Sequence, residues 1–210
     1  MPAARGHALA YPHNMTPTAA AARPAVIFDR DDTLVRCTDL VPSVGGDLGD
    51  PGRVELMPGA RETCRRLKAA GFVLGVASNQ GGVARGRYGL EQVGAVNDRV
   101  NELLGGSIDA FRVCPYHPLG VVCEYAREHP WRKPAPGMLL DLASTLNLDL
   151  ARSWMVGDAE RDIEAGRAAG CRTILVPRDG VAPGTTIADY VAPTLAGAAD
   201  IILRERITPP

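Results

Sequence analysis

The chain has 210 residues, of which 23 are Lys or Arg and 24 are Asp or Glu, for a formal net charge of −1. This balance argues against a protein that binds nucleic acid or an anionic membrane through bulk electrostatic attraction, and no apolar run reaches the length of a membrane helix. Five cysteines without regular spacing do not form a disulfide framework, so we expect a reducing, cytoplasmic location. The sequence does not reveal the oligomeric state, and a monomer is favoured.

The sequence divides into a short leader and one domain. Residues 1–24 are rich in Ala, Pro and Thr and lack the apolar block of a signal peptide, so we expect a disordered leader there. Residues 25–210 have a length typical of a single domain with a substantial core. The Gly- and Pro-rich segment 36–54 is too short to form a separate cap domain.

Apolar runs alternate with segments of helical periodicity along this domain. The runs predict strands at 25–28, 72–77, 108–113, 153–156 and 173–176, with a short edge strand at 190–191. The periodic segments, several of which end at Gly, predict helices over 60–70, 90–104, 136–146, 163–169 and 195–203. This alternation predicts an α/β fold with a doubly wound parallel sheet and a Rossmann-like core. No dinucleotide-binding or Walker A glycine pattern is present.

Polar side chains follow three of the predicted strands. Asp29 and Asp31 come after the first, Ser78 and Asn79 after the second, and Asp158 with Asp162 after the fourth, while Arg132 and Lys133 lie in the long irregular segment 114–136. The carboxyl ends of parallel strands meet at one edge of the sheet, so we expect these groups to converge on one pocket.

The residue types in this set suit phosphoryl transfer. Asp29 is the candidate nucleophile, which would form an aspartyl phosphate. Asp31 lies two residues further along an extended segment, on the same side, and is the candidate general acid and base. Mg²⁺ held by Asp29, the main-chain carbonyl of Asp31 and Asp158 would offset the repulsion between carboxylate and phosphate. Ser78, its neighbouring backbone amides and Lys133 would bind the phosphoryl oxygens, and Asn79 is a further candidate substrate-binding residue.

Each of these groups also has a purely structural explanation. Ser78 and Asn79 would also fit the start of a helix, and Lys133 would fit a solvated loop. Asp158 and Asp162 would fit a helix N-terminal turn, where the helix dipole favours acidic residues. The order in which all of them follow strand ends favours the catalytic interpretation.

Taken together, these motifs resemble the haloacid dehalogenase superfamily of aspartate-nucleophile phosphatases. Its four motifs correspond to residues 29–33, 78–79, 133 and 157–162 of this sequence. One departure is Asp32, which stands where the usual pattern has Gly. Because Asp tolerates unusual backbone angles better than most residues, we expect activity to survive.

Within the superfamily, the sequence is most similar to the small, capless branch of heptose bisphosphate and histidinol-phosphate phosphatases. The likeness lies in segments 50–59, 78–86, 114–118 and 132–138, and the ending Val83-Ala84-Arg85-Gly86 resembles the heptose enzymes. The resemblance implies a small sugar phosphate or bisphosphate as substrate, the heptose 7-phosphate first, with histidinol phosphate as the alternative. It also implies that Arg132 helps to hold the substrate, through a distal phosphate. A non-catalytic phosphometabolite-binding protein is the alternative of a different class.

Members of that branch usually carry a structural zinc in the loop before Arg132. Of its four ligand positions only Cys114 remains, because Tyr116, His129 and Trp131 occupy the other three. The resemblance therefore implies that this zinc site is lost. A rearranged set also has the ligand types of a tetrahedral zinc site, against the alternative of ordinary loop residues with Trp131 packing in place of the metal. That set comprises Cys114, His117, Cys123 and His129.

Overall fold

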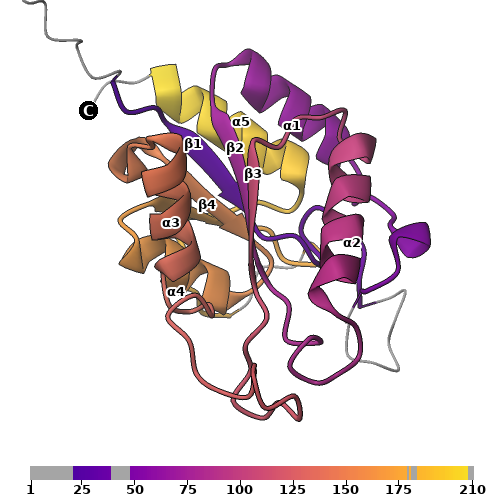
Figure 1. Ribbon diagram of the computed structural model, residues 1–210. Coiled ribbons are helices and arrows are strands. Elements are labelled where there is room, and N and C mark those ends of the chain that lie inside the picture. The colour runs from indigo at the N-terminus through magenta and orange to yellow at the C-terminus, as the bar shows by residue number, and fades with distance from the viewer. Residues whose placement is uncertain (1–20, 39–47, 179, 181–183, 208–210) are drawn as a thin grey trace, which may run out of the picture.

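The computed structural model describes residues 21–38, 48–178, 180 and 184–207 (Figure 1). Its strands are β1 (Ala25–Phe28), β2 (Val73–Asn79), β3 (Ala110–Cys114), β4 (Trp154–Gly157), β5 (Arg172–Leu175) and β6 (Tyr190–Val191). Its helices are α1 (Ala60–Ala69), α2 (Leu90–Leu103), α3 (Gly137–Leu146), α4 (Glu160–Ala168) and α5 (Leu195–Ile207). Two short 3₁₀ turns, η2 (Pro51–Arg53) and η3 (Leu150–Arg152), complete the described elements.

The strands form one parallel sheet in the order β3-β2-β1-β4-β5-β6. The chain winds outward from β1 to β3, then returns to the centre and winds the other way from β4 to β6. The order therefore reverses between β1 and β4, and ligands of doubly wound sheets bind at the carboxyl ends of strands at such a reversal. The predicted fold class is confirmed, and no part of the described chain forms a separate cap domain.

Two apolar cores cover the two faces of the sheet, because successive side chains of each strand point to opposite faces. Val26 and Phe28 of β1 pack in the core with α1, α2 and α5. Ala25 and Ile27 pack in the other core with α3 and α4. Figure 1 shows α3 and α4 on one side of the sheet and the remaining helices on the other. A strand buried on both faces explains why this stretch of sequence is continuously apolar.

The structure corrects several predicted boundaries. Strand β2 runs to Asn79 rather than ending at 77, so Ser78 and Asn79 are its last residues and do not follow it. Helix α4 begins at Glu160 rather than at 163, so Asp162 lies in its first turn. Arg23 lies in the predicted leader but pairs with the domain, because its N–H donates to the carbonyl of Asn147 and its carbonyl accepts from the N–H of Asp149. Arg23 thus belongs to the domain rather than to a leader. Residues 1–20 of the predicted leader and 39–47 of the predicted loop lie outside the described residues.

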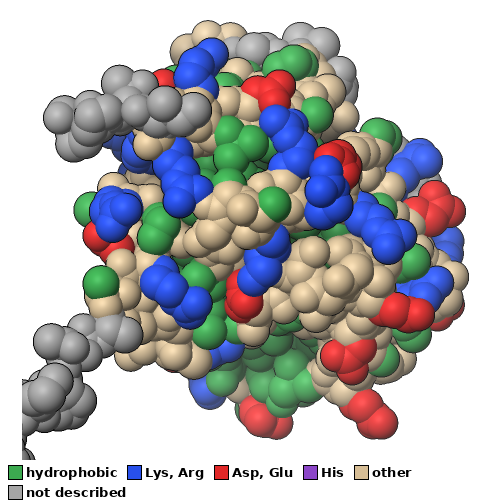
Figure 2. Space-filling view, turned by 90° about the horizontal axis from the view of Figure 1, so that it is seen from above, with side chains coloured by type: hydrophobic (Ala, Val, Ile, Leu, Met, Phe, Trp, Pro, Cys, Tyr) green, Lys and Arg blue, Asp and Glu red, His purple; other side chains and the backbone are tan. Residues whose placement is uncertain are grey.

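Charged side chains of both signs are spread over the end of the molecule at the top of Figure 1. Figure 2 shows Lys and Arg groups there separated by neutral and apolar surface. On α1, Arg66 pairs with Asp200 at 2.7 Å and Lys68 with Asp109 at 2.8 Å. None of the described helices is both long and apolar enough to cross a bilayer.

Candidate active site

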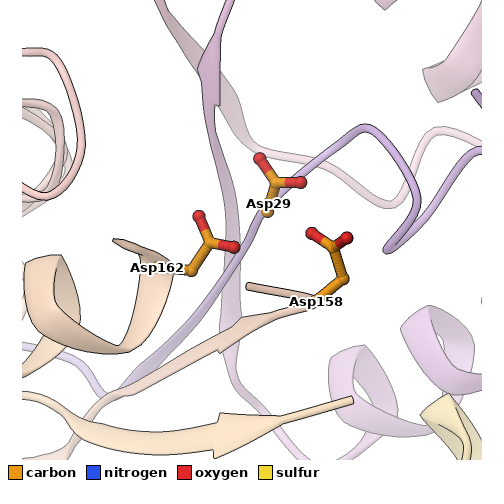
Figure 3. Close-up of side chains that lie close together, drawn as sticks. All are labelled: Asp29, Asp158 and Asp162. Atoms are coloured by element: carbon orange, nitrogen blue, oxygen red, sulfur yellow. The ribbon is translucent and has the colours of Figure 1, made fainter. Parts of the chain in front are cut away.

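Three carboxylates converge where the strand order reverses. Asp29 follows β1 directly and its N–H donates to the carbonyl of Val156 at 2.9 Å, which fixes it beside the end of β4. Asp158 follows β4, and Asp162 reaches in from the first turn of α4 (Figure 3). Oxygens of the three side chains all lie within 4.8 Å of one another. Among the described residues, they are the only group of three or more His, Cys, Asp and Glu side chains so closely placed.

Lys133 supplies the counter-charge of this cluster. Its side chain is fully buried, and its Nζ lies 2.6 Å from Asp29 Oδ1 and 2.7 Å from Asp162 Oδ1. The same ammonium donates to the carbonyl of Ala77 at 2.7 Å. Burial opposes the charged form, but the attraction of Asp162 and Asp29 outweighs it and the pKa of Lys133 is raised. The structural alternative of a solvated loop charge is thus wrong.

Burial also dominates the titration of the carboxylates. It raises the pKa of Asp29 to about 7, against the opposing attraction of Lys133 and with added repulsion from Asp162 and Asp158. The pKa of Asp158 is raised as well, chiefly by burial and then by the charge of Asp162. The single positive charge of Lys133 therefore does not balance the negative charge of the three carboxylates.

Three oxygens of the cluster are buried and accept no hydrogen bond from the described residues: Asp29 Oδ2, Asp158 Oδ1 and Asp162 Oδ1. The last has Lys133 Nζ as its ion-pair partner at 2.7 Å, which leaves Asp29 Oδ2 and Asp158 Oδ1. Buried carboxylate oxygens are normally satisfied, so these two point to a further cationic partner. Oxygen ligands at this spacing suit a hard divalent cation such as Mg²⁺. The residues present therefore fit the metal that the sequence implies, with Asp162 as an acidic neighbour that the sequence did not assign to it.

The side chain of Asn79 contacts the backbone of the loop that carries Lys133. Its Nδ2 donates to the carbonyl of Lys133 and its Oδ1 accepts the N–H of Lys133, both at 3.0 Å. This two-point clamp holds the backbone of the loop from which Lys133 enters the core. Both polar atoms of the Asn79 side chain thus contact the backbone of Lys133, so Asn79 positions Lys133, and its role in substrate binding stays a prediction.

Asp31 is held from two sides. The guanidinium of Arg30 donates to both of its carboxylate oxygens, from Nε at 2.9 Å and from Nη2 at 3.2 Å. Gln80 Nε2 donates to Asp31 Oδ2 and to Ser78 Oγ, both at 2.7 Å, and Gln80 Oε1 accepts from the hydroxyl of Tyr88. Arg30 itself is fully buried. The side chain of Asp31 is therefore fixed beside the acidic cluster without belonging to it.

Arg132 lies at the edge of the site and is not one of the groups that touch Asp29. Its Nη1 donates to the carbonyl of Tyr116 at 3.1 Å. Its pKa is lowered, first by burial and then by the like charges of Arg85 and Arg161, outweighing the opposite effect of nearby anionic groups. Arg132 therefore lies within electrostatic reach of the guanidinium groups of Arg85 and Arg161, and that of Arg161 lies 3.9 Å from Asp158 Oδ1.

Asp32 adopts the left-handed conformation that the family's glycine would supply, with φ of 60°. Its carboxylate occupies the turn that follows: Oδ1 accepts the N–H groups of Cys37 and Thr38 at 2.9 and 3.0 Å. Oδ2 accepts from the hydroxyl of Thr38. These bonds compensate the strain of a non-glycine residue at positive φ.

The four zinc candidates do not meet. Among the described residues, Cys114, His117, Cys123 and His129 supply no three ligand atoms close enough to share an ion. Cys114 is buried at the end of β3, whereas Cys123 is exposed. The rearranged zinc set is therefore not supported.

An aromatic stack occupies the other three positions of the family's zinc pattern. The rings of Tyr116 and His129 stack with centroids 4.1 Å apart, and Trp131 meets His129 edge-on at 6.1 Å. The guanidinium of Arg127 lies 4.5 Å from the ring centre of Tyr116. These contacts connect the two ends of the loop before Lys133.

Comparisons with known proteins agree with this geometry. Residues 130–198 match the family described as "HAD-hyrolase-like". The chain is 41% identical to the D-glycero-D-manno-heptose-1,7-bisphosphate 7-phosphatase of Thermosynechococcus vestitus, over 86% of this chain and 95% of that protein. It is 36% identical to the corresponding β-heptose enzyme of Yersinia pestis, over 82% and 92% of the two chains. A crystal structure of D,D-heptose 1,7-bisphosphate phosphatase from B. bronchiseptica complexed with magnesium and phosphate superposes on this chain with a TM-score of 0.70. The two sequences are 30% identical, and the match covers 87% of this chain and 99% of that chain.

Proposed function

The chain belongs to the haloacid dehalogenase superfamily of phosphatases, and we propose that it hydrolyses a sugar bisphosphate through an aspartyl phosphate formed on Asp29. As a member of this family it is a phosphoric monoester hydrolase rather than a non-catalytic binding protein. The observation that carries the proposal is the pairing of Asp29 with Lys133 at the strand reversal. One oxygen of the nucleophile is fixed by the ammonium at 2.6 Å, while the other accepts no hydrogen bond.

In the proposed reaction, a carboxylate oxygen of Asp29 attacks the phosphorus and displaces the sugar oxygen, which forms the acyl phosphate. Asp31 delivers a proton to the leaving oxygen and then removes one from the water that cleaves the acyl phosphate. Arg30 and Gln80 hold the carboxylate of Asp31 in place for both transfers. The buried ammonium of Lys133 and the hydroxyl of Ser78 face the charge that develops on the phosphoryl oxygens.

Asp29, Asp158 and the main-chain carbonyl of Asp31 would hold Mg²⁺, and Asp162 adds negative charge beside them. When bound, the ion offsets the repulsion between the substrate phosphate and the carboxylate that attacks it. The buried oxygens Asp29 Oδ2 and Asp158 Oδ1, which accept no hydrogen bond from the described residues, support this assignment. A crystallised relative that holds magnesium and phosphate supports it as well.

We propose D-glycero-D-manno-heptose 1,7-bisphosphate as the substrate, cleaved at the 7-phosphate. Relatives at 36% and 41% identity carry this activity in their names. The guanidinium groups of Arg85 and Arg161 lie within electrostatic reach of Arg132, and the three together would attract the second phosphate. The cytoplasmic location and the monomeric state that the sequence favours remain predictions.

A substrate panel tests this proposal. Phosphate release is measured with the heptose 1,7-bisphosphate, the heptose 1-phosphate, the heptose 7-phosphate, histidinol phosphate and several hexose phosphates. We expect the highest kcat/KM for the bisphosphate, with one phosphate released and the 1-phosphate left as product. A higher kcat/KM for histidinol phosphate would move the assignment to the other activity of the branch. An equal kcat/KM for the bisphosphate and the heptose 7-phosphate would show that no second phosphate is recognised.

A further inference from the structure

Asp32 has a partner that its role in the turn does not require. Its Oδ2 lies 3.1 Å from Nη2 of Arg178, a residue in the segment that follows β5. The side chain of Asp32 is buried, whereas that of Arg178 is 44% exposed. Glycine, the usual residue of the family at this position, has no charged side chain. The ion pair with Arg178 therefore depends on the Asp that this chain has instead.

Arg178 also contacts the acidic cluster. The same Nη2 atom lies 3.3 Å from Asp158 Oδ2, so one guanidinium nitrogen bridges Asp32 and Asp158. The contact is made to only one oxygen of Asp158. The other, Oδ1, accepts no hydrogen bond from the described residues, and the guanidinium of Arg161 lies 3.9 Å from it. Arg178 thus contacts one oxygen of Asp158 and leaves Oδ1 available to a metal.

We infer that Asp32 and Arg178 are positioning residues for the metal ligand Asp158. Asp32 anchors Arg178, and Arg178 fixes the orientation of the Asp158 carboxylate so that Oδ1 is directed at the metal. Partners of this kind, one contact removed from the ion, orient ligands and raise metal affinity. The inference rests on the magnesium site proposed above and adds to it two residues that do not touch the metal or the substrate.

The competing explanation treats Arg178 as a cation that opposes metal binding by repulsion. The two explanations predict opposite changes in metal affinity when Arg178 is removed. Without Arg178, repulsion is relieved and the free carboxylate of Asp32 attracts the ion, so metal binding would tighten. If Arg178 instead orients Asp158, its removal frees that carboxylate to rotate and metal binding weakens.

Direct binding of Mn²⁺, followed through the paramagnetic signal of the free ion, tests the inference without any turnover. The variants are Asp32→Asn, Arg178→Met and the double variant of the full chain. Asn keeps an acceptor for the N–H groups of Cys37 and Thr38 and tolerates positive φ, so Asp32→Asn retains the turn. We expect each single variant to raise the Kd about tenfold, as the loss of such a partner typically does. The double variant should be no weaker than the weaker single variant, since both changes remove one shared support.

A matched cycle corrects for the change in net charge. Glu62 and Arg65 form an exposed pair on α1 at 2.6 Å, and Glu62→Gln, Arg65→Met and their double variant should leave the Kd unchanged. Three results would overturn the inference: a Kd within about twofold of wild type, tighter binding by Arg178→Met, or effects that multiply in the double variant. If Asp32→Asn does not fold, the direction in which Arg178→Met changes the Kd for Mn²⁺ decides between the two explanations. Failure of the wild type to bind Mn²⁺ would instead refute the metal site itself.

Discussion

Lys133 and Asp29 are separated by 104 residues in the sequence, yet their charged atoms lie 2.6 Å apart inside the domain. Asp162 shares the same ammonium, so a single buried cation contacts two carboxylates. Such an arrangement is stable only while the partners remain together, because a buried charge without its counter-ion is costly. The catalytic proposal and the stability of the domain therefore depend on the same three side chains.

Replacement of Lys133 by Met should impair both properties. Loss of one member of a buried ion pair typically costs about 3–5 kcal/mol, and we expect a decrease in the free energy of unfolding of that order at neutral pH. Phosphate release should fall at least about 100-fold, as on removal of a group that stabilises transition-state charge.

Lys68→Met is the matched control, because Lys68 is partly exposed and pairs with Asp109 on the surface. Its effect on stability should stay within about 1 kcal/mol. Urea unfolding and a phosphate-release assay measure the two variants side by side. Equal stability losses in both would contradict the role given to the buried pair.

Asn79→Ala should lower kcat with little change in KM. The amide of Asn79 clamps the backbone of Lys133 at two points and does not need to touch the substrate. Its loss releases the loop that carries the ammonium, which acts on the transition state more than on the bound substrate. Steady-state kinetics on the best substrate provide the measurement. A raised KM with kcat retained would instead support the substrate-binding role that the sequence predicts for Asn79.

The stability of the metal-free protein should depend on pH through Asp29. Its pKa is about 7 in the folded protein and near the ordinary 3.8 when unfolded, so between these values the folded state holds a proton that the unfolded state has lost. The contribution of Asp29 is therefore fully present below the unfolded pKa and is lost as pH rises through about 7.

Thermal unfolding in EDTA from about pH 5 to about pH 8 checks this sign. Wild type should lose stability relative to Asp29→Asn as the pH rises, because Asn does not titrate. Added Mg²⁺ should stabilise wild type more at the alkaline end, where the proton no longer competes for the carboxylate. If the stability of wild type relative to Asp29→Asn stays constant or rises with pH, a raised pKa of Asp29 is contradicted.

Gly157→Ala should disrupt the acidic cluster. A Cβ at this position would lie 2.4 Å from the Cβ of Asp162, so the first turn of α4 has to move. Because that turn presents a carboxylate to Lys133, we expect loss of metal binding and a decrease in stability of about 1–3 kcal/mol, as for other overpacked sites.

Gly94→Ala is the matched control. Gly94 lies in α2, where an added Cβ has no neighbour within 4 Å, and Ala should stabilise the helix by up to about 1 kcal/mol. Binding of Mn²⁺ and chemical unfolding distinguish the two variants. Normal metal binding by Gly157→Ala would show that the position of Asp162 is not needed for the site.

The sequence predicts the fold well because its signals are local and repeated. The apolar run before Asp29 and the Gly residues after several helices each specify an element within a few residues of chain. The sequence predicts the start of α4 too late, since Glu160 and Arg161 are polar and the apolar periodicity begins only at Ile163. The domain contact of Arg23 is not predictable, because a single bridge to the chain near Leu148 leaves no pattern in the sequence.

The site is predictable only in part. The positions of Asp29, Asp158 and Lys133 follow from strand ends and from the family resemblance. The burial of Arg30 against Asp31 does not, because an arginine between two acidic residues is usually solvated. The contact of Arg178 with Asp32 joins residues that are distant in the sequence, and no motif connects them. Side chain partners of this kind depend on packing that only the folded chain defines.

The most direct test of the catalytic proposal compares wild type and Asp29→Asn on the heptose 1,7-bisphosphate, each with Mg²⁺ and with EDTA, in proteins shown to be folded by circular dichroism. The account predicts phosphate release by wild type only with Mg²⁺, and none by the variant under either condition. Release by Asp29→Asn at a rate comparable to wild type would contradict nucleophilic attack by Asp29.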